Sequence, residues 1–487
     1  MLPRLSWLCL SLLVSVPLCA SQAQPPALPG TGAPASKSDR IYCGDQTSNT
    51  VTVIRPWDNK VLGTIALGQP RLSSLLNPQY VDRVNSHGLG FSRDGKYIVN
   101  LSTTSNTVTV IRTLDNSIVS TTSVGRNAHE AFFSADNRTV WAGTRGVETL
   151  AIVDGLKGGV IENIPAPGGP SKVVFSPNSD LAYVNHIRAA YIGIYDVASR
   201  KLLRNITGLA DTFSSDMMID ATGQRLWVAH KMTGQVSVLS LVTNKVVGIL
   251  NTGPETNHPN HAIINGIHYG FVTVAAENTT KVYTQNDPEK IPTLVGEIRS
   301  SGVEPHGLWP NADNKRMYIL NEHSDTVDVA DLTSWPFKII DTMNVGQEGQ
   351  ALVYVSNAVP SGNGTQNLGT QGLTGKPAMN ALINVDEGPR ETSWENVSST
   401  ALITVRPAAG LEMFQIIGRN MELNATYVAS ASCLHCHGAR IPLVEFVAST
   451  PVPGMMGCGG APQTLAFFKF DGVYDIKSVQ IHRKQDD

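Results

Sequence analysis

The stretch Ser-His-Gly-Leu-Gly-Phe-Ser-Arg-Asp-Gly at residues 86–95 is one copy of a phrase that recurs along most of this 487-residue chain. Close relatives of it surround His129 (Ala-His-Glu-Ala-Phe-Phe-Ser-Ala-Asp-Asn) and His306 (Pro-His-Gly-Leu-Trp-Pro-Asn-Ala-Asp-Asn). Alignment gives seven copies spaced by 42 to 46 residues, with matched positions at His87, His129, Ser171, Ser215, His261, His306 and Gln350. A regular period of this size indicates stacked supersecondary units that bury their apolar faces against one another.

Each copy reads as four short strands separated by polar turns. The third strand is the clearest, because Asn49-Thr-Val-Thr-Val-Ile and Asn106-Thr-Val-Thr-Val-Ile alternate with period two. Four strands in a repeat of this length predict a propeller blade. The first copy, Ile41 to Gly68, has only the last three strands, and the last, Gly349 to Asn357, has only the first. Pairing the strand at 351–355 with the one that follows Ile41 closes a ring of seven blades without a free sheet edge.

The chain therefore resembles the seven-bladed YVTN propellers, also called surface-layer-like or quinoprotein amine dehydrogenase-like propellers. The motifs that carry the resemblance are Ala-Tyr-Val-Asn-His at 182–186, Leu-Trp-Val-Ala-His at 226–230 and Met-Tyr-Ile-Leu-Asn at 317–321. The likeness covers residues 41–357. It implies the fold and leaves the function open, because propellers carry many unrelated activities.

The segments outside residues 41–357 predict export from the cell and a second β-domain, so that the whole chain is all-β. Residues 1–23, with Arg4 and an apolar run from Leu5 to Leu18, read as a secretory signal peptide, and residues 24–40 as a Pro-rich leader. Residues 358–377 read as a linker, and 378–487 as a small β-sandwich-like domain. We expect a secreted protein, extracellular or periplasmic, without a membrane span. The scattered charges, with a formal net charge of -3, give no basic stripe for nucleic acid.

Export bears on two kinds of modification. Glycosylation sequons stand at Asn100, Asn137, Asn205, Asn278, Asn363, Asn396 and Asn424. Cys433, Cys436 and Cys458 are candidates for disulfide bonds, with Cys43 far away in the first blade. Cys433-Leu-His-Cys436-His437 also matches the attachment pattern of covalent haem c, which we weigh below the disulfide loop, and a Cys/His metal site ranks third.

Histidines converge on one end of the predicted channel. Identical positions of a closed ring meet near its axis, so we expect His87, His129, His261 and His306 to bind one transition metal, copper, iron or zinc, since neutral imidazole suits these ions. His186 and His230, at the ends of second strands, are candidate acid/base groups, and His258 and His323 are expected close by. Glu130 and Glu304 are candidates to orient imidazoles. For any single histidine, hydrogen bonding to its own loop is the simpler explanation.

These patterns support three functional hypotheses. The first is an exported metal-dependent oxidoreductase that acts on a small molecule at the channel mouth. The second is a noncatalytic propeller that binds a protein or glycan partner. The third is a haem-linked redox protein that uses the Cys433–His437 motif. The sequence indicates neither the oligomeric state nor the substrate.

Overall fold

In the computed structural model, residues 30–68, 83, 85–373, 379–387, 398–408, 411–433, 439–448, 464–468 and 476–484 are described. The predicted signal peptide and Asn396 lie outside these residues, as do Cys436, His437 and Cys458. No helix among the described residues is long and apolar enough to cross a membrane. The described helical segments are the short 3-10 turns η1 (Ala275–Glu277) and η2 (Glu322–Ser324), and the fold is all-β.

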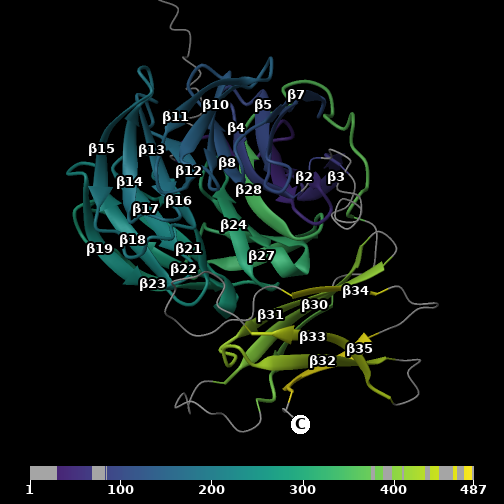
Figure 1. The fold of residues 1–487 in the computed structure, drawn as a ribbon. Helices are drawn as coiled ribbons and strands as arrows, with labels where there is room; N and C mark the ends of the chain where they lie inside the picture. Colours follow the sequence, from purple (N-terminus) through teal and green to yellow (C-terminus); the bar gives the residue numbers. More distant parts are fainter. Residues whose placement is uncertain are drawn as a thin grey trace, which may run out of the picture.

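Residues 40–355 form seven four-stranded antiparallel sheets within the described chain, in a propeller-like arrangement (Figure 1). The strands of each sheet are given from inner to outer. The first sheet contains β28 (Gly349–Val355), β1 (Arg40–Asp45), β2 (Thr50–Arg55) and β3 (Lys60–Ala66), and the second contains β4 (Ser86–Phe91), β5 (Tyr97–Ser102), β6 (Thr107–Arg112) and β7 (Ile118–Ser123). The third sheet contains β8 (Ala128–Phe133), β9 (Thr139–Thr144), β10 (Thr149–Asp154) and β11 (Val160–Pro165). The next two are β12 (Pro170–Phe175), β13 (Leu181–His186), β14 (Tyr191–Asp196) and β15 (Lys201–Thr207); β16 (Asp216–Ile219), β17 (Arg225–His230), β18 (Gln235–Ser240) and β19 (Lys245–Asn251). The last two are β20 (Thr256–Ile264), β21 (Ile267–Val274), β22 (Thr279–Thr284) and β23 (Thr293–Arg299); β24 (Pro305–Pro310), β25 (Arg316–Asn321), β26 (Thr326–Asp331) and β27 (Lys338–Asn344).

Burial falls from the inner to the outer strand of each sheet. Every residue of the inner strand β8 is buried, whereas the outer strand β11 of the same sheet is mostly exposed. This gradient explains why the middle strands alternate in sequence and the inner ones read as apolar runs interrupted by polar groups. The polar groups on inner strands therefore lie along the central channel.

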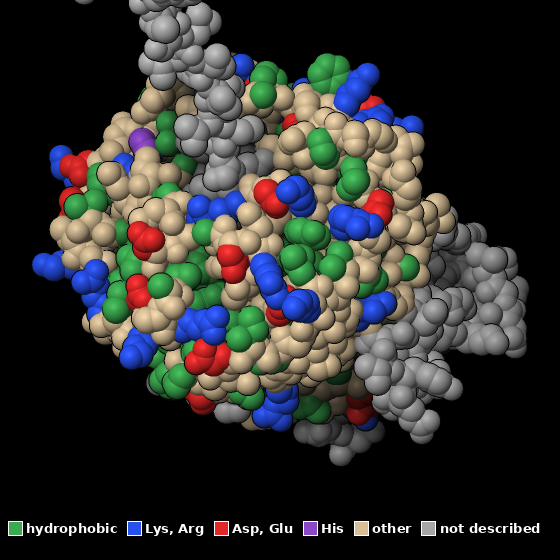
Figure 2. Space-filling view, turned by 90° about the horizontal axis from the view of Figure 1, so that it is seen from above, with side chains coloured by type: hydrophobic (Ala, Val, Ile, Leu, Met, Phe, Trp, Pro, Cys, Tyr) green, Lys and Arg blue, Asp and Glu red, His purple; other side chains and the backbone are tan. Residues whose placement is uncertain are grey.

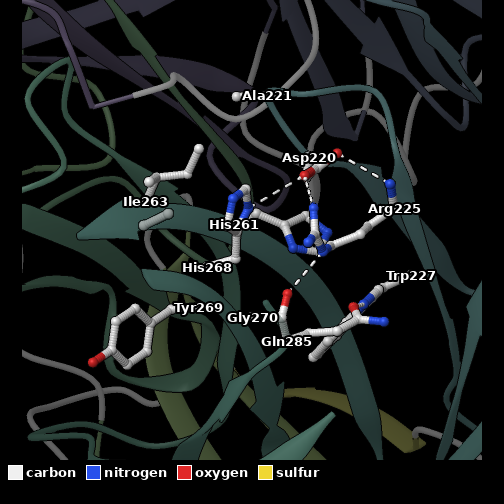
Figure 3. A pocket seen from close by; sticks show the side chains of 11 residues that line it. Asp220, Ala221, Arg225, Trp227, His261, Ile263, His268, Tyr269, Gly270 and Gln285 are labelled. Carbon is white, nitrogen blue, oxygen red and sulfur yellow. Dashed lines mark hydrogen bonds and ion pairs between the residues drawn. The ribbon is translucent and has the colours of Figure 1, made fainter. Parts of the chain in front are cut away.

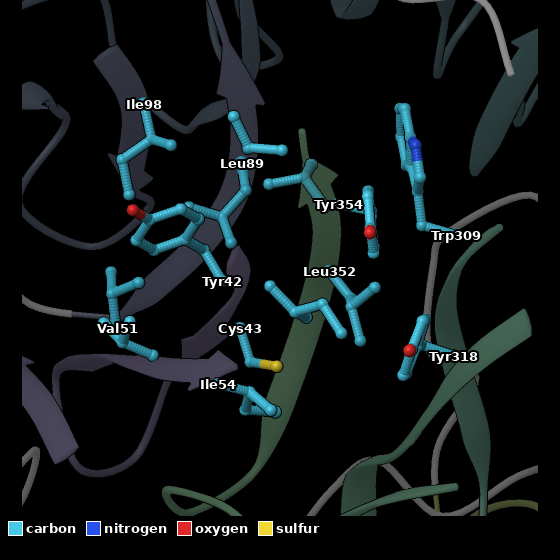
Figure 4. Close-up of a cluster of buried hydrophobic side chains, with 14 of the residues drawn as sticks. Tyr42, Cys43, Val51, Ile54, Leu89, Ile98, Trp309, Tyr318, Leu352 and Tyr354 are labelled. Carbon is cyan, nitrogen blue, oxygen red and sulfur yellow. The ribbon is translucent and has the colours of Figure 1, made fainter. Parts of the chain in front are cut away.

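The two ends of the propeller segment meet in one sheet. Strand β28 pairs with β1, with Ile41 opposite Tyr354 and Cys43 opposite Leu352, as the incomplete first and last repeats predict. Inner strands contact the next inner strand around the ring, and β28 contacts both β24 and β4. Figure 4 shows the buried side chains at this joint, where Tyr42, Leu352 and Tyr354 pack together near Trp309.

The repeat alignment was wrong in one sheet. Strand pairing places Thr256 opposite Val274 before a bulge and Pro259 opposite Val272 after it, as Pro305 and Leu308 are placed in β24. The residue equivalent to His306 is therefore Asn257, and His261 lies four residues further along β20. The cause is the tight turn at Asn265–Gly266, both with positive φ, which lengthens β20 beyond the other inner strands.

The predicted linker packs along the propeller over its described part, residues 358–373. The amide of Asn116 donates to the carbonyl of Gly364 at 2.9 Å, and Arg40 donates to that of Asn363 at 2.7 Å. The amide nitrogen of Thr64 bonds the carbonyl of Gly369 at 2.9 Å. This segment is therefore held to the blades rather than free, because its backbone groups find partners there.

The C-terminal region forms two sheets that share one core. The strands are β29 (Met379–Asn384), β30 (Thr400–Ala408), β31 (Leu411–Arg419) and β34 (Thr464–Phe468) in one sheet, and β33 (Ile441–Val447), β32 (Thr426–Cys433) and β35 (Ile476–Arg483) in the other. Ile403 and Phe414 from the first sheet pack with Tyr427 and Ile481 from the second. Figure 1 shows this region, in yellow-green, beside one side of the propeller.

The modification sites differ in exposure. Asn205, Asn363 and Asn424 are exposed, and Asn137 and Asn278 are partly exposed. Asn100 is fully buried and its amide donates to Ser86 Oγ at 2.8 Å, which leaves no room for a glycan in the folded chain. Cys43 is a buried free thiol. The disulfide and haem predictions stay predictions, since the side chain of Cys433 also lies outside the described residues.

Candidate functional site

Ionisable side chains form a continuous network where the inner strands begin, at the mouth of the channel. We call it the mouth cluster. Its members are His87, His129, Glu130, Lys172, Asp216, His258, Glu304, His306, Glu322 and His323. Most come from the start of an inner strand, and Glu322 and His323 come from the turn η2 that follows β25.

His87 and His129 contact each other directly. Their Nε2 atoms are 2.8 Å apart, and Nδ1 of His129 lies 3.2 Å from Ser171 Oγ. Two nitrogens bound to one tetrahedral metal with bonds near 2.05 Å would be about 3.3 Å apart. The shorter distance indicates a hydrogen bond between the two rings. As arranged here, the pair can exchange a proton more readily than it can share an ion.

Lys172 lies between two buried carboxylates. Its Nζ is 3.0 Å from Glu130 Oε2 and 2.7 Å from Asp216 Oδ2. Oδ2 of Asp216 is also 3.5 Å from Nδ1 of His258. Glu130, Asp216 and His258 are close enough to share a metal ion, but the Lys172 ammonium already supplies the compensating charge.

The other end of the network combines carboxylates with imidazoles, and Lys231 contacts one of these carboxylates, Glu304. The rings of His258 and His306 lie 4.5 Å apart between centroids. His306 Nε2 is 3.8 Å from Glu322 Oε2, and His323 Nε2 is 3.2 Å from Glu304 Oε2. Glu304, Glu322 and His323 offer ligand atoms within 4.8 Å of one another. We refer to these three residues as the carboxylate–histidine centre.

Hydrogen-bond direction fixes the tautomer of His306. Its Nδ1 lies 2.8 Å from the carbonyl oxygen of Gln350, which can only accept, so Nδ1 carries the proton. Burial lowers the pKa of His306 well below 6.5, and the ring is neutral. Its Nε2 lone pair therefore faces the Glu322 carboxylate, an arrangement of two acceptors that requires a proton or cation between them.

Burial shapes the charges of the carboxylate–histidine centre. Burial, followed by the neighbouring Glu304, raises the pKa of Glu322 to about 7. Burial opposes charge on His323, but Glu304 and Glu322 outweigh it and raise the pKa of His323 to about 9. Lys231 Nζ, 3.6 Å from Glu304 Oε1, adds a further positive charge. The two cations, His323 and Lys231, therefore balance the charges of Glu304 and Glu322.

Burial also keeps the imidazoles of His129 and His258 neutral. It lowers the pKa of His129 and of His258 well below 6.5, and nearby Arg145 and Lys172 respectively lower it further. Burial raises the pKa of Glu130 to about 8, despite Lys172. Neutral imidazoles can act as proton acceptors or metal ligands at neutral pH.

Three of the histidines predicted to act here lie elsewhere. His261 lines a small pocket with Asp220, Arg225, Trp227 and His268, and donates through Nε2 to the carbonyl of Met218 at 3.1 Å (Figure 3). His230 bonds the carbonyl of Phe213 and Ser237 Oγ, so both of its ring nitrogens have structural partners. His186 is fully buried against Tyr191, with ring centroids 4.4 Å apart. The geometry thus joins His87, His129 and His306 with His258 and His323.

Sequence reasoning missed several members of the network. Lys172 and Asp216 follow directly after Ser171 and Ser215, the matched positions of their repeats, and the same offset holds Glu130. A bulge at the start of β8 and of β12 turns this next residue toward its neighbours as well. A charged residue after the matched position in three successive repeats was the available signal.

The C-terminal region contacts the propeller beside this centre. Arg419 makes two hydrogen bonds of 2.6 Å with the carboxylate of Glu255, just before β20. Arg406 donates to Asp325 at 2.8 Å, directly after η2, and Gln415 Nε2 is 3.3 Å from Glu348 Oε1. Arg406 and Gln415 are buried in these contacts. Strands β30 and β31 therefore cover the part of the mouth next to Glu322 and His323.

The surface seen from above has no field of a single charge. Figure 2 shows Lys and Arg side chains interspersed with acidic and apolar ones over this side of the propeller.

Comparison with solved structures supports the β-propeller fold. A Bacteroides fragilis protein described as a proposed 6-phosphogluconolactonase is 10% identical, with a TM-score of 0.54 over 67% of this chain and 100% of that one. The periplasmic gluconolactonase PpgL of Pseudomonas aeruginosa is 15% identical, with a TM-score of 0.52 over 65% and 99%. A protein of unknown function from Desulfotomaculum acetoxidans is 13% identical, with a TM-score of 0.53 over 65% and 98%. No family model matches the chain, and no curated protein matches its sequence.

Proposed function

We propose that this chain is an exported metal-dependent oxidoreductase acting on a small molecule. The metal ion is held by Glu304, Glu322 and His323, with Nε2 of His306 as a further ligand. One observation carries the proposal: the lone pair of His306 Nε2 faces the Glu322 carboxylate across 3.8 Å. A bound cation would resolve that repulsion, as would a proton on Glu322, whose pKa is raised to about 7. The backbone partner on Nδ1 is typical of metal-ligating histidines.

The unsatisfied groups of the centre support the same assignment. His323 is fully buried, and its ring forms an ion pair with Glu304 at 3.2 Å rather than a hydrogen bond of standard geometry. Oε2 of Glu304 makes none either, although it lies 3.2 Å from that ring. Buried polar groups without hydrogen bonds are costly. A cation bound between Glu304 and His323 would give these atoms a partner.

The ligand atoms limit which metal ion the site favours. Two carboxylates with two imidazoles suit iron, manganese or zinc better than copper, since carboxylates are hard ligands. Iron or manganese would supply the electron-transfer step that an oxidoreductase needs. The neutral rings of His129 and His258 would accept or return protons beside the ion.

We also propose an architecture for the whole chain. The seven sheets are the blades of a YVTN-type propeller closed by β28 and β1, and residues 378–487 form a β-sandwich-like domain. An N-terminal signal peptide, disulfide bonds and glycans fit a secreted protein. Exposed Asn205, Asn363 and Asn424 are the positions best placed for glycans.

Elemental analysis of the purified chain tests the proposal. We expect near one equivalent of iron or manganese in the wild type and at most a tenth of that in Glu304→Gln/His323→Gln. His268→Gln is the matched control, because His268 also pairs with a buried carboxylate, Asp220, at 3.6 Å, but lies outside the mouth cluster. A wild type without metal, or equal metal in both variants, contradicts the assignment. An iron or manganese spectrum unaffected by ferricyanide and dithionite contradicts the redox role.

Lactone hydrolysis is a second candidate. Two structural neighbours are described as gluconolactonases of established or proposed activity, and a divalent ion can polarise a lactone carbonyl. Zinc in place of iron or manganese, with hydrolysis of glucono-lactone that is lost in Glu304→Gln/His323→Gln, would favour it. Redox turnover without hydrolysis would exclude it.

A further inference from the structure

Arg145 points a guanidinium at the mouth cluster from a well-held backbone. It follows β9, its amide nitrogen bonds the carbonyl of Asn127 at 3.0 Å, and its own carbonyl accepts from Arg188 at 2.8 Å. Its Nε donates to Ser171 Oγ at 2.8 Å and its Nη2 to the carbonyl of Ser215 at 3.1 Å. The guanidinium carbon lies 5.8 Å from the centroid of the Phe213 ring.

The side-chain hydrogen bonds of Arg145 go to neutral groups, although burial lowers its pKa and the nearby Glu130 and Asp216 raise it. Within the described chain it forms no ion pair, whereas Arg406 and Arg419 each bind a carboxylate and Lys172 binds two. A guanidinium carries five N–H donors, and the hydrogen bonds found for Arg145 use Nε and Nη2. The side chain is partly exposed. Burial lowers the pKa of Arg145 to about 10, so the group stays charged at neutral pH.

Ser171 connects this charge to the histidine pair. Because Nε of Arg145 can only donate, the Ser171 hydroxyl hydrogen is free to point at His129 Nδ1. A neutral His129 then carries its proton on Nε2 and donates it to Nε2 of His87. The ring of His87 is therefore protonated on Nδ1. A substrate at Arg145 would lie beside a pair of imidazoles whose proton positions are set.

We propose that Arg145 is the anchor for a carboxylate on the substrate, so that the mouth accepts anionic small molecules. A planar, fixed, charged donor without a carboxylate of its own is the geometry that binds this group with two parallel hydrogen bonds. This inference rests on the proposed function, because it assigns a substrate class to the same mouth. The proposed anchor lies in the half of the mouth cluster away from Arg406 and Arg419.

Ligand-observed NMR with a panel of monocarboxylates tests the anchor. The panel is gluconate, benzoate and pyruvate at millimolar concentration, and sorbitol is the neutral counterpart of gluconate. We expect the wild type to bind at least one carboxylate, Arg145→Gln to bind it at least about tenfold more weakly, and sorbitol to be ignored. Arg126→Gln, which changes an exposed arginine on the adjacent turn, should bind as the wild type does.

Three results would overturn the anchor: no binding of any panel member, equal binding by Arg145→Gln, or equal binding of sorbitol. Thermal unfolding and metal content are measured on each variant, so that a folding defect is recognised. In that case Arg145→Lys replaces Arg145→Gln. This variant keeps the positive charge but loses the two parallel N–H donors of the guanidinium, and it should bind the carboxylate with intermediate affinity. Carboxylate binding that depends on Arg145 in a metal-free wild type would leave the anchor standing while the metal assignment fails.

Discussion

Nζ of Lys172 lies 2.7 Å from Oδ2 of Asp216, and both side chains are almost wholly shielded from water. Glu130 completes the group at 3.0 Å. A lysine thus takes the place that a cation would occupy between two carboxylates. This contact gives one half of the mouth cluster a lysine between two carboxylates, whereas the other half pairs its carboxylates with His323 and Lys231.

Removal of the Lys172 charge should therefore destabilise the propeller. Lys172→Met leaves two buried carboxylates without their partner, and we expect the free energy of unfolding in urea to fall by about 3–5 kcal/mol. The triple change Lys172→Met/Glu130→Gln/Asp216→Asn should recover most of that loss, because no buried charge remains. Equal stability of the single variant and the wild type would show that the three charges do not depend on one another.

Acid should weaken the fold through two histidines outside the mouth. Burial lowers the pKa of His186 and of His261 to about 4, from 6.5 in the unfolded chain. Between those values the unfolded chain binds more protons, so stability falls as the pH drops from 6.5 to 4, by up to about 3 kcal/mol for each ring. Urea unfolding at pH 7.0, 5.5 and 4.5 measures the slope. His186→Asn/His261→Gln should reduce the slope, to which the buried His129, His258 and His306 also contribute. An unchanged slope would refute this origin.

The C-terminal region should leave the mouth when its arginine contacts are lost. We expect Arg406→Met/Arg419→Met to weaken docking by about 1–3 kcal/mol, as both changes remove charged hydrogen bonds. Hydrogen exchange of amides near Glu255 and Asp325 should accelerate. Arg483→Met, which breaks the 2.6 Å pair with Glu422 inside the C-terminal region, is the control and should not change exchange at those propeller positions.

Ring closure should depend on the packing of β28. Leu352→Ala truncates a side chain that is 3% exposed at the joint with β1, and we expect a loss of about 2–5 kcal/mol. Leu382→Ala removes the same atoms from a side chain that is 60% exposed and should cost less than about 0.5 kcal/mol. Calorimetry of both variants measures the difference, and similar melting temperatures would argue against a closed ring.

The sequence predicted the strands better than the site. The repeat around His87, His129 and His306 indicated the inner strands, because alternation and turn residues are local properties. The alignment failed at β20, where the Asn265–Gly266 turn extends the strand and places His261 in the pocket with Asp220. His258 was expected nearby, yet its contact with His306 depends on a bulge that no local pattern reveals.

Tertiary contacts account for the rest. Lys172 can neutralise two carboxylates only because β8 and β16 bring Glu130 and Asp216 to either side of it. The pairing of Arg419 with Glu255 likewise joins residues that are 164 positions apart in the sequence. Contacts of that kind have no sequence signature in a single chain. The likeness to YVTN propellers likewise indicated the fold and was silent on the carboxylates that define the centre.

Anomalous X-ray diffraction from crystals of the wild-type protein, collected on either side of the iron and manganese absorption edges, would locate the metal ion. We expect one strong anomalous peak within about 2.0–2.3 Å of ligand atoms from Glu304, Glu322 and His323. The peak should be missing from crystals of Glu304→Gln/His323→Gln with the same fold. A peak between Glu130 and Asp216 instead, or no peak in a metal-supplemented wild type, would contradict the proposed metal site.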